Sequence, residues 1–303
     1  MVQSNDTVLT LVAPAEQGLP AGTVAVVRSA LKDAHASLSP TDWLADGIAC
    51  DIAFEGCLAD VAEAVVRQVL ADQPVDVFVQ PNTGDRRKML MVADMDSTMV
   101  TSETLDDLAA HAGLKDRIAA ITERAMRGEL DFESALRERV GMLKGLAASA
   151  LDETFAEIVY MPGAKALVQT MRANGATCLL VSGGFTAFTG RVAAWLGFHD
   201  HRANTLHVEN GVLVGTVGEP ILGREAKVKT LVEEAGKLRL PLTRTLAVGD
   251  GANDLAMLQA AGLGVAYHAK PLVREAARFR VDYGDQTALL FAQGYRQAEF
   301  IAG

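Results

Sequence analysis

Hydrophobic positions between residues 5 and 80 follow two spacings in turn. Three short runs rich in β-branched and aromatic residues predict strands: Val8–Val12, Ile48–Phe54 and Val75–Val79. Two stretches carry apolar residues at helical spacing, Gly22–Ala36 and Leu58–Ala71. The pattern therefore predicts a small domain over residues 1–80 with the order strand, helix, strand, helix, strand.

A polar segment follows this domain. Pro81–Lys88 mixes turn-forming residues with charge, which is typical of a linker. Its Arg86-Arg87-Lys88 cluster has the composition of a solvated surface. We therefore expect residues 81–88 to connect two domains, with these three cations pointing into water.

From residue 89 to residue 303, strand-like and helical patterns alternate, which favours a parallel sheet with helices on both faces. Three apolar, β-rich runs stand out: Met89–Ala93, Thr177–Val181 and Thr245–Val248. Each leads directly into polar or glycine residues. Because ligands of open α/β sheets bind beyond the carboxyl ends of the strands, we expect these polar residues to meet at one edge.

Two insertions interrupt that alternation. Residues from about 103 to 155 predict several helices with no strand between them, and we interpret them as a helical cap over the sheet edge. Residues from about 205 to 217 are two β-rich runs joined at Asn210-Gly211, a dipeptide that favours a type I′ hairpin.

Composition narrows the class of partner. The chain has 303 residues, with 28 Lys and Arg against 38 Asp and Glu, and a formal net charge of −10. Such an acidic chain repels phosphate backbones and anionic lipid, so we expect a small-molecule ligand rather than nucleic acid or a membrane. No apolar run approaches the ~18 residues that span a bilayer, and the three cysteines form no CxxC pair. We expect a cytoplasmic protein.

The end of the first strand carries two acids. Asp94 and Asp96 stand two residues apart, and in extended structure both carboxylates can face the same side. Taken alone, such a pair is also typical of a helix N-cap. The third strand end brings Asp250, Asn253 and Asp254 to the same edge. Hard oxygen ligands without His or Cys suit Mg²⁺.

The end of the second strand supplies hydrogen-bond donors. The Ser182 hydroxyl and the backbone N–H groups of Gly183 and Gly184 can hold phosphate oxygens. Lys227, which follows the hairpin, can neutralise the charge of a transferring group, although alone it would be interpreted as a surface lysine. A carboxylate nucleophile, Mg²⁺, a donor loop and a lysine together predict phosphoryl transfer through an aspartyl-phosphate.

These residues stand in the order of a known family. Asp94-Met-Asp-Ser-Thr, Ser182-Gly-Gly, Lys227 and Gly249-Asp-Gly-Ala-Asn-Asp254 resemble the four motifs of the haloacid dehalogenase superfamily. Further segments resemble the phosphoserine phosphatases within it: Thr101-Ser-Glu-Thr, Arg124-Ala-Met-Arg-Gly, Asp131-Phe-Glu-Ser-Ala-Leu-Arg-Glu-Arg-Val140, Val181-Ser-Gly-Gly-Phe185 and Asn210-Gly211. The resemblance runs from about residue 88 to 290. It implies an α/β fold with a doubly wound parallel sheet and a helical cap insertion.

The resemblance also implies catalytic roles. Asp94 would be the nucleophile, and Asp96 would protonate the leaving oxygen and then activate water. Lys227 and Ser182 would bind the phosphoryl oxygens, and Asp254 would orient Lys227 without itself contacting the substrate or the metal. Mg²⁺ would be held by Asp94, the backbone carbonyl of Asp96, and Asp250.

Substrate recognition is expected from the cap. Glu103 would meet the ammonium of phosphoserine and Arg139 its carboxylate, which guanidinium can bind through two hydrogen bonds. Met126 and Phe132 would be apolar walls, with Ser182, Gly183, Lys227 and Asn253 completing the substrate-binding set. From spacing alone, Arg139 could equally be one more charge on a charged helix, and Met126 and Phe132 could be core residues.

The N-terminal domain resembles the ACT-like module, a small α+β ferredoxin-like fold, with one further strand expected near Thr41–Ala45. Such modules bind amino acids or pair with another copy, so support or homodimerisation is the plainest role and serine sensing the alternative.

The expected activity is Mg²⁺-dependent hydrolysis of O-phospho-L-serine, the last step of serine biosynthesis. Two alternatives share the chemistry: a phosphotransferase that passes phosphate to another alcohol such as homoserine, and a phosphatase of a related phosphorylated amino acid. A catalytically silent amino-acid-sensing module is an alternative of a different class.

Overall fold

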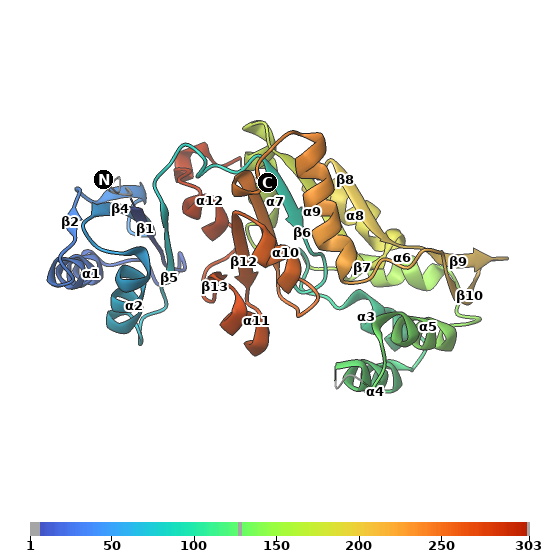
Figure 1. Ribbon diagram of the computed structural model, residues 1–303. Coiled ribbons are helices and arrows are strands. Elements are labelled where there is room, and N and C mark those ends of the chain that lie inside the picture. The colour runs from blue at the N-terminus through green and yellow to red at the C-terminus, as the bar shows by residue number, and fades with distance from the viewer. Residues whose placement is uncertain (1–6, 127–128, 302–303) are drawn as a thin grey trace.

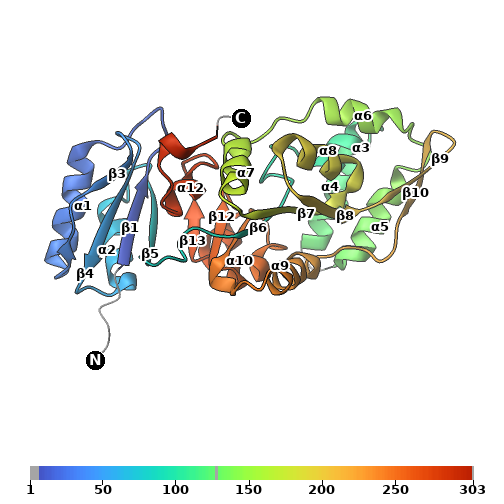
Figure 2. The ribbon, with the colours of Figure 1, turned by 90° about the horizontal axis from the view of Figure 1, so that it is seen from above.

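The computed structural model describes residues 7–126 and 129–301, and the side chain of Met126 lies outside this description. The N-terminal part is an antiparallel sheet with two helices on its outer face (Figures 1 and 2). Its elements are β1 (Thr7–Val12), α1 (Ala21–Asp33), β2 (Ser37–Leu38), β3 (Asp42–Ala45), β4 (Ala49–Glu55), α2 (Ala59–Val69) and β5 (Asp76–Pro81). The strand order is β2-β4-β1-β5, and β3 also pairs with β4. We call this part the N-terminal unit.

The pattern of hydrophobic positions predicted most of these elements. β1, β4, β5, α1 and α2 lie within three residues of the predicted bounds, and the strand expected near Thr41–Ala45 is β3. The two-residue strand β2 was missed, because a run that short carries no periodicity.

The larger unit is a parallel sheet of six strands in the order β13-β12-β11-β6-β7-β8. These strands are β6 (Leu90–Ala93), β7 (Thr177–Phe185), β8 (Asp200–Asn204), β11 (Thr245–Gly249), β12 (Leu263–Tyr267) and β13 (Phe279–Val281). The helices that cover it are α7 (Ala164–Ala173), α8 (Thr186–Leu196), α9 (Glu225–Lys237), α10 (Leu255–Ala260), α11 (Pro271–Ala276) and α12 (Ala288–Ala292). The doubly wound parallel sheet is therefore confirmed. None of the described helices has the length and apolar character needed to cross a membrane.

Alternation of side chains along the central strands divides the core in two. In β6, Met91 and Ala93 pack into one hydrophobic cluster, whereas Leu90 and Val92 pack into another on the opposite face. The first cluster lies under α7, α8 and α12 and the second under α9, α10 and α11 (Figure 2). Both faces of the sheet are thereby buried, which explains why its strands read as continuous hydrophobic runs.

Strand order brings the chemistry together. The chain builds β6, β7 and β8 outward in one direction and then returns to place β11 on the other side of β6. β6 is therefore flanked by the two strands whose ends carry the other motifs. A reversal of this kind opens a crevice at the carboxyl edge of the sheet.

The cap consists of α3 (Thr104–His111), α4 (Lys115–Met126), α5 (Phe132–Met142) and α6 (Ser149–Ala156), with no strand between them. The predicted hairpin is β9 (Leu206–Glu209) and β10 (Val212–Val217), paired antiparallel. It attaches to the cap, since Gly145 N–H donates to the carbonyl of Leu213 (2.8 Å) and Ala148 N–H to that of Gly211 (2.8 Å). The hairpin and the cap lie together at the end of the molecule away from the N-terminal unit (Figure 1).

The two units share one hydrophobic core. Val12, Leu44 and Phe78 of the N-terminal unit belong to the same buried cluster as Phe279 of β13 and Leu289 of α12. The rings of Phe78 and Phe279 lie 6.2 Å apart between centroids. The inner face of the N-terminal sheet is therefore buried against the larger unit.

The expectation of a solvated cluster at Arg86-Arg87-Lys88 was wrong for two of its residues. The Arg86 side chain is only 11% exposed to solvent. It pairs with Asp51 (2.5 Å) and donates to the carbonyl of Ala292 (3.1 Å). Lys88 is buried and donates to the carbonyls of Asp85 and Thr243. Apart from Asp85, which is three residues from Lys88, the acceptors come from distant parts of the chain, so the local charge pattern could not show them.

Close packing of α10 on β12 depends on Gly264. A Cβ placed there would lie 1.8 Å from the carbonyl oxygen of Leu258, a backbone atom that cannot move aside. We expect Gly264→Ala to lower the free energy of unfolding by about 3 kcal/mol or more, seen as a lower melting temperature. Gly236→Ala in α9 is the control, because a Cβ there meets nothing within 4 Å. Equal melting temperatures for the two variants would contradict this packing.

Candidate active site

The end of β6 presents Asp94 at the carboxyl edge of the sheet. The Asp94 N–H donates to the carbonyl of Val248 in β11 (3.0 Å), so the backbone still follows the sheet at this residue. The Asp94 side chain is buried, and its Oδ1 accepts from the N–H of Met95 (2.8 Å). Directly afterwards the chain turns sharply, with Ser97 in the left-handed region at φ 53°. Asp94 is thus fixed at the mouth of a tight loop.

Lys227 lies between two buried carboxylates. Helix α9 carries it to the sheet edge, where its Nζ lies 2.7 Å from Asp94 Oδ1 and 2.6 Å from Asp254 Oδ1. Lys227 is 2% exposed to solvent, and Asp254 is fully buried. The second oxygen of Asp254 accepts from the N–H of Gly251 (3.1 Å). Both oxygens of Asp254 are therefore engaged in holding Lys227 and the loop after β11.

Burial alone would lower the pKa of Lys227, but the charges of Asp254 and Asp94 outweigh it and raise that pKa above its ordinary value. Lys227 therefore stays a cation. Burial, followed by the charge of Asp254, raises the pKa of Asp94, and Lys227 opposes this.

Three carboxylates at this edge are close enough to hold a metal ion. One oxygen each from Asp94, Asp250 and Asp254 lies within 4.8 Å of the others. Asp250 is buried, and its Oδ1 accepts a long hydrogen bond from the Thr98 hydroxyl (3.4 Å), while Lys270 Nζ lies 3.6 Å from its Oδ2. Asp254 holds its two partners closely, at 2.6 and 3.1 Å, whereas the contacts of Asp250 are longer, at 3.4 and 3.6 Å. Asp94 and Asp250 are therefore the carboxylates best placed to bind a cation. All three offer hard oxygen donors.

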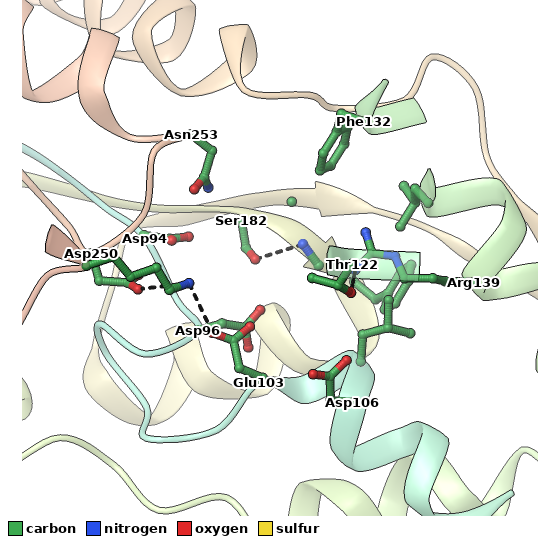
Figure 3. A pocket seen from close by; sticks show the side chains of 16 residues that line it. Asp94, Asp96, Glu103, Asp106, Thr122, Phe132, Arg139, Ser182, Asp250 and Asn253 are labelled. Carbon is green, nitrogen blue, oxygen red and sulfur yellow. Dashed lines mark hydrogen bonds and ion pairs between the residues drawn. The ribbon is translucent and has the colours of Figure 1, made fainter. Parts of the chain in front are cut away.

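Asp96 lies on the opposite side of the loop from this cluster, toward the cap. Its Oδ1 accepts from the backbone N–H of Thr104, the first residue of α3 (3.1 Å). A Cβ at Gly184 would lie 3.2 Å from Asp96 Oδ2, so the glycine allows the two strand ends to approach. Burial, and secondly the charge of Glu103, raise the pKa of Asp96 to about 7. Figure 3 shows Asp96 and Glu103 side by side.

The loop at the end of β7 is held in place from the side. Gly184 N–H donates to the Ser182 hydroxyl (2.9 Å), and Ser182 is buried. The side-chain amide of Asn204 donates to the carbonyls of Gly183 (2.9 Å) and Leu222 (3.2 Å), and its oxygen accepts from the N–H of Leu222 (2.7 Å). Asn204 therefore ties this loop to the segment leading into α9. The sequence analysis missed it.

The cap closes these groups into a cavity of about 140 Å³. Its lining includes Asp94, Asp96, Ser182, Gly183, Asp250 and Asn253 from the sheet edge, and Glu103, Phe132 and Arg139 from the cap side (Figure 3). This volume is below the roughly 300–1,000 Å³ of pockets for drug-sized ligands, so the cavity suits a small molecule.

Two cap residues lie on one face of α5. The Phe132 ring touches the backbone of the Ser182 loop, since a Cβ at Gly183 would lie 3.2 Å from its Cζ. The Arg139 guanidinium donates to the carbonyl of Ala135 (3.2 Å) and to the Thr122 hydroxyl (3.3 Å). Burial lowers the pKa of Arg139, and the charges of Asp106 and Glu103 oppose this. Arg139 is thus a partly buried cation facing two acids across the cavity.

The structure brings together the predicted residues whose side chains it describes. Asp254 and Lys227 lie beneath the cavity rather than in its lining, and Met126 lies outside the described side chains. The polar lining residues that the sequence analysis missed are Asp106, Thr122 and Lys270, and the apolar ones are Leu105, Leu136 and Phe185. Asp106 follows Glu103 by three residues, a spacing that would have placed both on one helix face. Lys270 follows β12, the strand beyond those that carry the motifs.

Comparison with known proteins places this geometry in a family. The model of haloacid dehalogenase-like hydrolases matches residues 91–259. A phosphoserine phosphatase of Streptomyces coelicolor is 42% identical over 252 residues, covering 82% of this chain and 62% of that protein. A phosphoserine phosphatase of Polaromonas sp. is 45% identical over 207 residues, covering 66% of this chain and 88% of that protein.

Among solved structures, a haloacid dehalogenase family hydrolase of Salmonella enterica serovar Typhi superposes with a TM-score of 0.84 at 28% identity. The match covers 97% of this chain and 99% of that one, so the N-terminal unit is included. The chain spans about three fifths of the length of its Streptomyces relative.

We expect the ion triad of Asp94, Lys227 and Asp254 to contribute to the stability of the fold. Lys227→Met would leave two buried carboxylates without their cation, which costs about 3–5 kcal/mol, so we expect a clearly lower melting temperature without added metal. Lys229→Met is the matched control two residues along α9, because Lys229 is 73% exposed. If both variants melted together, Lys227 would not be the charge that holds the site.

Proposed function

Because the chain belongs to the haloacid dehalogenase-like hydrolases, and within them to the phosphoserine phosphatases, we propose that it hydrolyses O-phospho-L-serine to L-serine and phosphate. The observation that carries the proposal is a single cavity with Asp94 and Lys227 at its base and, on the cap side, an acid, Glu103, and a cation, Arg139. We place the reaction as the last step of serine biosynthesis, in the cytoplasm. The free thiols of Cys50, Cys57 and Cys178 support that compartment.

In this proposal Asp94 attacks phosphorus and forms an aspartyl-phosphate, while the bond to the serine oxygen breaks. Its fixed backbone and its burial support this role, since a nucleophile must be held in one orientation. Lys227 lies beside Asp94 Oδ1 and neutralises charge on the transferring group. Ser182 and the N–H of Gly183 bind the phosphoryl oxygens from the next strand end, with Asn253 opposite.

The cofactor in this proposal is Mg²⁺. The three carboxylates outnumber the two lysines beside them, Lys227 and Lys270, so the cluster keeps a net negative charge that a divalent ion would offset. Asp94, Asp250 and the backbone carbonyl of Asp96 would hold the ion, and Asp254 would act one step away by orienting Lys227. When bound, Mg²⁺ polarises the phosphoryl group and offsets its negative charge.

Asp96 acts as the proton donor and acceptor. It lines the cavity from the sheet edge, beside the first residue of the cap helix α3, where the serine oxygen would leave. A serine alkoxide is a poor leaving group, so proton transfer from Asp96 accompanies cleavage and contributes ~10²–10⁴-fold. Asp96 then takes a proton from the water that attacks the aspartyl-phosphate, which releases phosphate and restores Asp94.

Recognition of the amino acid falls to the cap. Glu103 would bind the ammonium group and Arg139 the carboxylate, with Phe132 and Met126 as apolar walls. The Ser97 hydroxyl (2.9 Å) and Lys270 Nζ (3.9 Å) both lie on Oε1 of Glu103, so the second carboxylate oxygen, Oε2, can face an ammonium ion. Arg139 is held by two hydrogen bonds from its own side of the cavity, so its position is set before substrate arrives.

We expect phosphate release from O-phospho-L-serine to require Mg²⁺ and to vanish in Asp94→Asn, because the amide cannot attack phosphorus. The measurement is inorganic phosphate with and without EDTA. Release from an activated aryl phosphate but not from phosphoserine would leave the chemistry in place and overturn the substrate assignment.

Arg139→Ala should raise KM for phosphoserine about 10- to 100-fold, the effect of losing a charge-assisted hydrogen bond of 1.5–3 kcal/mol, with KM for p-nitrophenyl phosphate changed little. Arg137→Ala is the control on the same helix, since Arg137 is 49% exposed and pairs with Glu219 instead. Equal losses on both substrates would contradict the role of Arg139 in binding the carboxylate.

A further inference from the structure

The N-terminal unit reaches the larger unit through a buried acid. Asp76 begins β5 and keeps 2% of its exposure. Its Oδ1 accepts from the backbone N–H groups of Asp282 (2.7 Å) and Tyr283 (3.2 Å), and its Oδ2 accepts from that of Gly284 (2.7 Å). One carboxylate thus satisfies three successive N–H groups of the segment that follows β13. Removal of the carboxylate would leave these three N–H groups without an acceptor, which costs free energy in a buried place.

The segment held by Asp76, residues 282–286, is fixed from a second side as well. A Cβ at Gly284 would lie 3.0 Å from Asp76 Oδ2, so a larger residue there would press on the carboxylate. The carbonyl of Gly284 is 2.9 Å from Nε2 of His268, in the loop after β12. The segment therefore has little freedom while Asp76 is in place.

Two residues farther on, the same segment reaches the catalytic loop. Gln286 is fully buried, and its side-chain amide donates to the carbonyl of Thr98 (2.7 Å). Its backbone N–H donates to the carbonyl of Pro162 (3.1 Å). Thr98 lies four residues after Asp94, and its hydroxyl faces Asp250 Oδ1 (3.4 Å). Residues 282–286 thus connect β5 of the N-terminal unit to the loop that bears the nucleophile and to a carboxylate of the metal site.

A second junction joins the two units without leading to the site. Arg86 pairs with Asp51 of β4, donates to the Thr10 hydroxyl (2.7 Å) and contacts the carbonyls of Phe291 and Ala292 at the end of α12. None of these partners lines the cavity. Both junctions are largely buried, but the first joins a carboxylate to backbone N–H groups, the second contains an ion pair, and they differ in what they hold.

We propose that Asp76 is a positioning residue for phosphoryl transfer, which acts through residues 282–286 and Gln286 to fix the Thr98 loop and Asp250. The N-terminal unit is then part of the catalytic apparatus, even though none of its described residues, 7–81, lines the cavity. This proposal rests on the proposed function in one respect: phosphoserine hydrolysis is the reaction whose kcat is measured to test it.

Asp76→Ala should lower kcat about 10- to 100-fold, because displacement of a reacting group by about 1 Å can cost 10²-fold. KM for phosphoserine should change little, since Glu103 and Arg139 lie on the cap. The same variant should need more Mg²⁺ for half-maximal stabilisation in a thermal shift assay. Asp76→Asn keeps one acceptor oxygen and should fall between wild type and Asp76→Ala, and it serves where the alanine variant does not fold.

Arg86→Met is the matched control. It breaks a buried ionic junction between the same units, so it should lower the melting temperature while kcat stays within about twofold of wild type. If Arg86→Met lowered kcat as far as Asp76→Ala does, general loosening of the N-terminal unit would explain both and the proposal would be wrong.

A double-mutant cycle tests the route through the segment. Asp76→Ala and Gln286→Leu act on one chain of contacts, so the double variant should lose little more kcat than the worse single variant. Losses that multiply would overturn the route. The cycle is measured as kcat on phosphoserine, as kcat on p-nitrophenyl phosphate, and as the shift in melting temperature that Mg²⁺ produces. A wild-type enzyme inactive on phosphoserine would refute the proposed function, while the cycle on the other two measurements still decides this proposal.

Discussion

The site depends on one buried ammonium group held between two buried carboxylates. Each of these charges costs several kcal/mol to remove from water, and only their close pairing offsets that cost. Lys227 therefore needs Asp94 on one side and Asp254 on the other, 2.7 and 2.6 Å away. This requires three chain segments to meet at one point, which the parallel order β11-β6-β7 provides at its carboxyl edge. The lack of a side chain at Gly249 and Gly251 leaves room for Asp254 and Asn253 against the backbone.

The cap turns this charged edge into a chamber for a small molecule. Phe132 rests on the Ser182 loop, and Arg139 faces Asp106 and Glu103 across the cavity. The hairpin β9–β10 supports the cap by backbone hydrogen bonds rather than by contributing side chains to the cavity. The groups that perform chemistry thus come from the sheet, and those that would select the substrate come from the insertion. Different substrates could then be served by changing the cap while the sheet edge stays the same.

The N-terminal unit is joined to this apparatus by both apolar and polar contacts. The Phe78 and Phe279 rings share a core, while Asp76, Gln80 and Arg86 hydrogen-bond across the junction. Buried polar contacts fix one relative arrangement, because any other would leave the acceptors and donors unpaired. Removal of residues 1–80 would expose an apolar face and release residues 282–286.

Local pattern in the sequence determined the elements and the chemistry. Periodicity predicted β1, β4, β5, β6, β7 and β11 and the helices α1 and α2, since burial on one or two faces leaves its spacing in the chain. The strands β2, β8, β12 and β13 were not predicted individually. Motif residues at strand ends predicted Asp94, Ser182 and Asp250 at a common edge, because parallel strands share that edge. The tertiary structure alone decided partners that are distant in sequence. Arg86 looked solvated because Asp51 and Ala292 lie far from it in the chain, and nothing near Asp76, Asn204 or Gln286 indicates the backbone groups that each one holds. A buried hydrogen bond is specified by where two segments meet, and that is a property of the fold rather than of either segment.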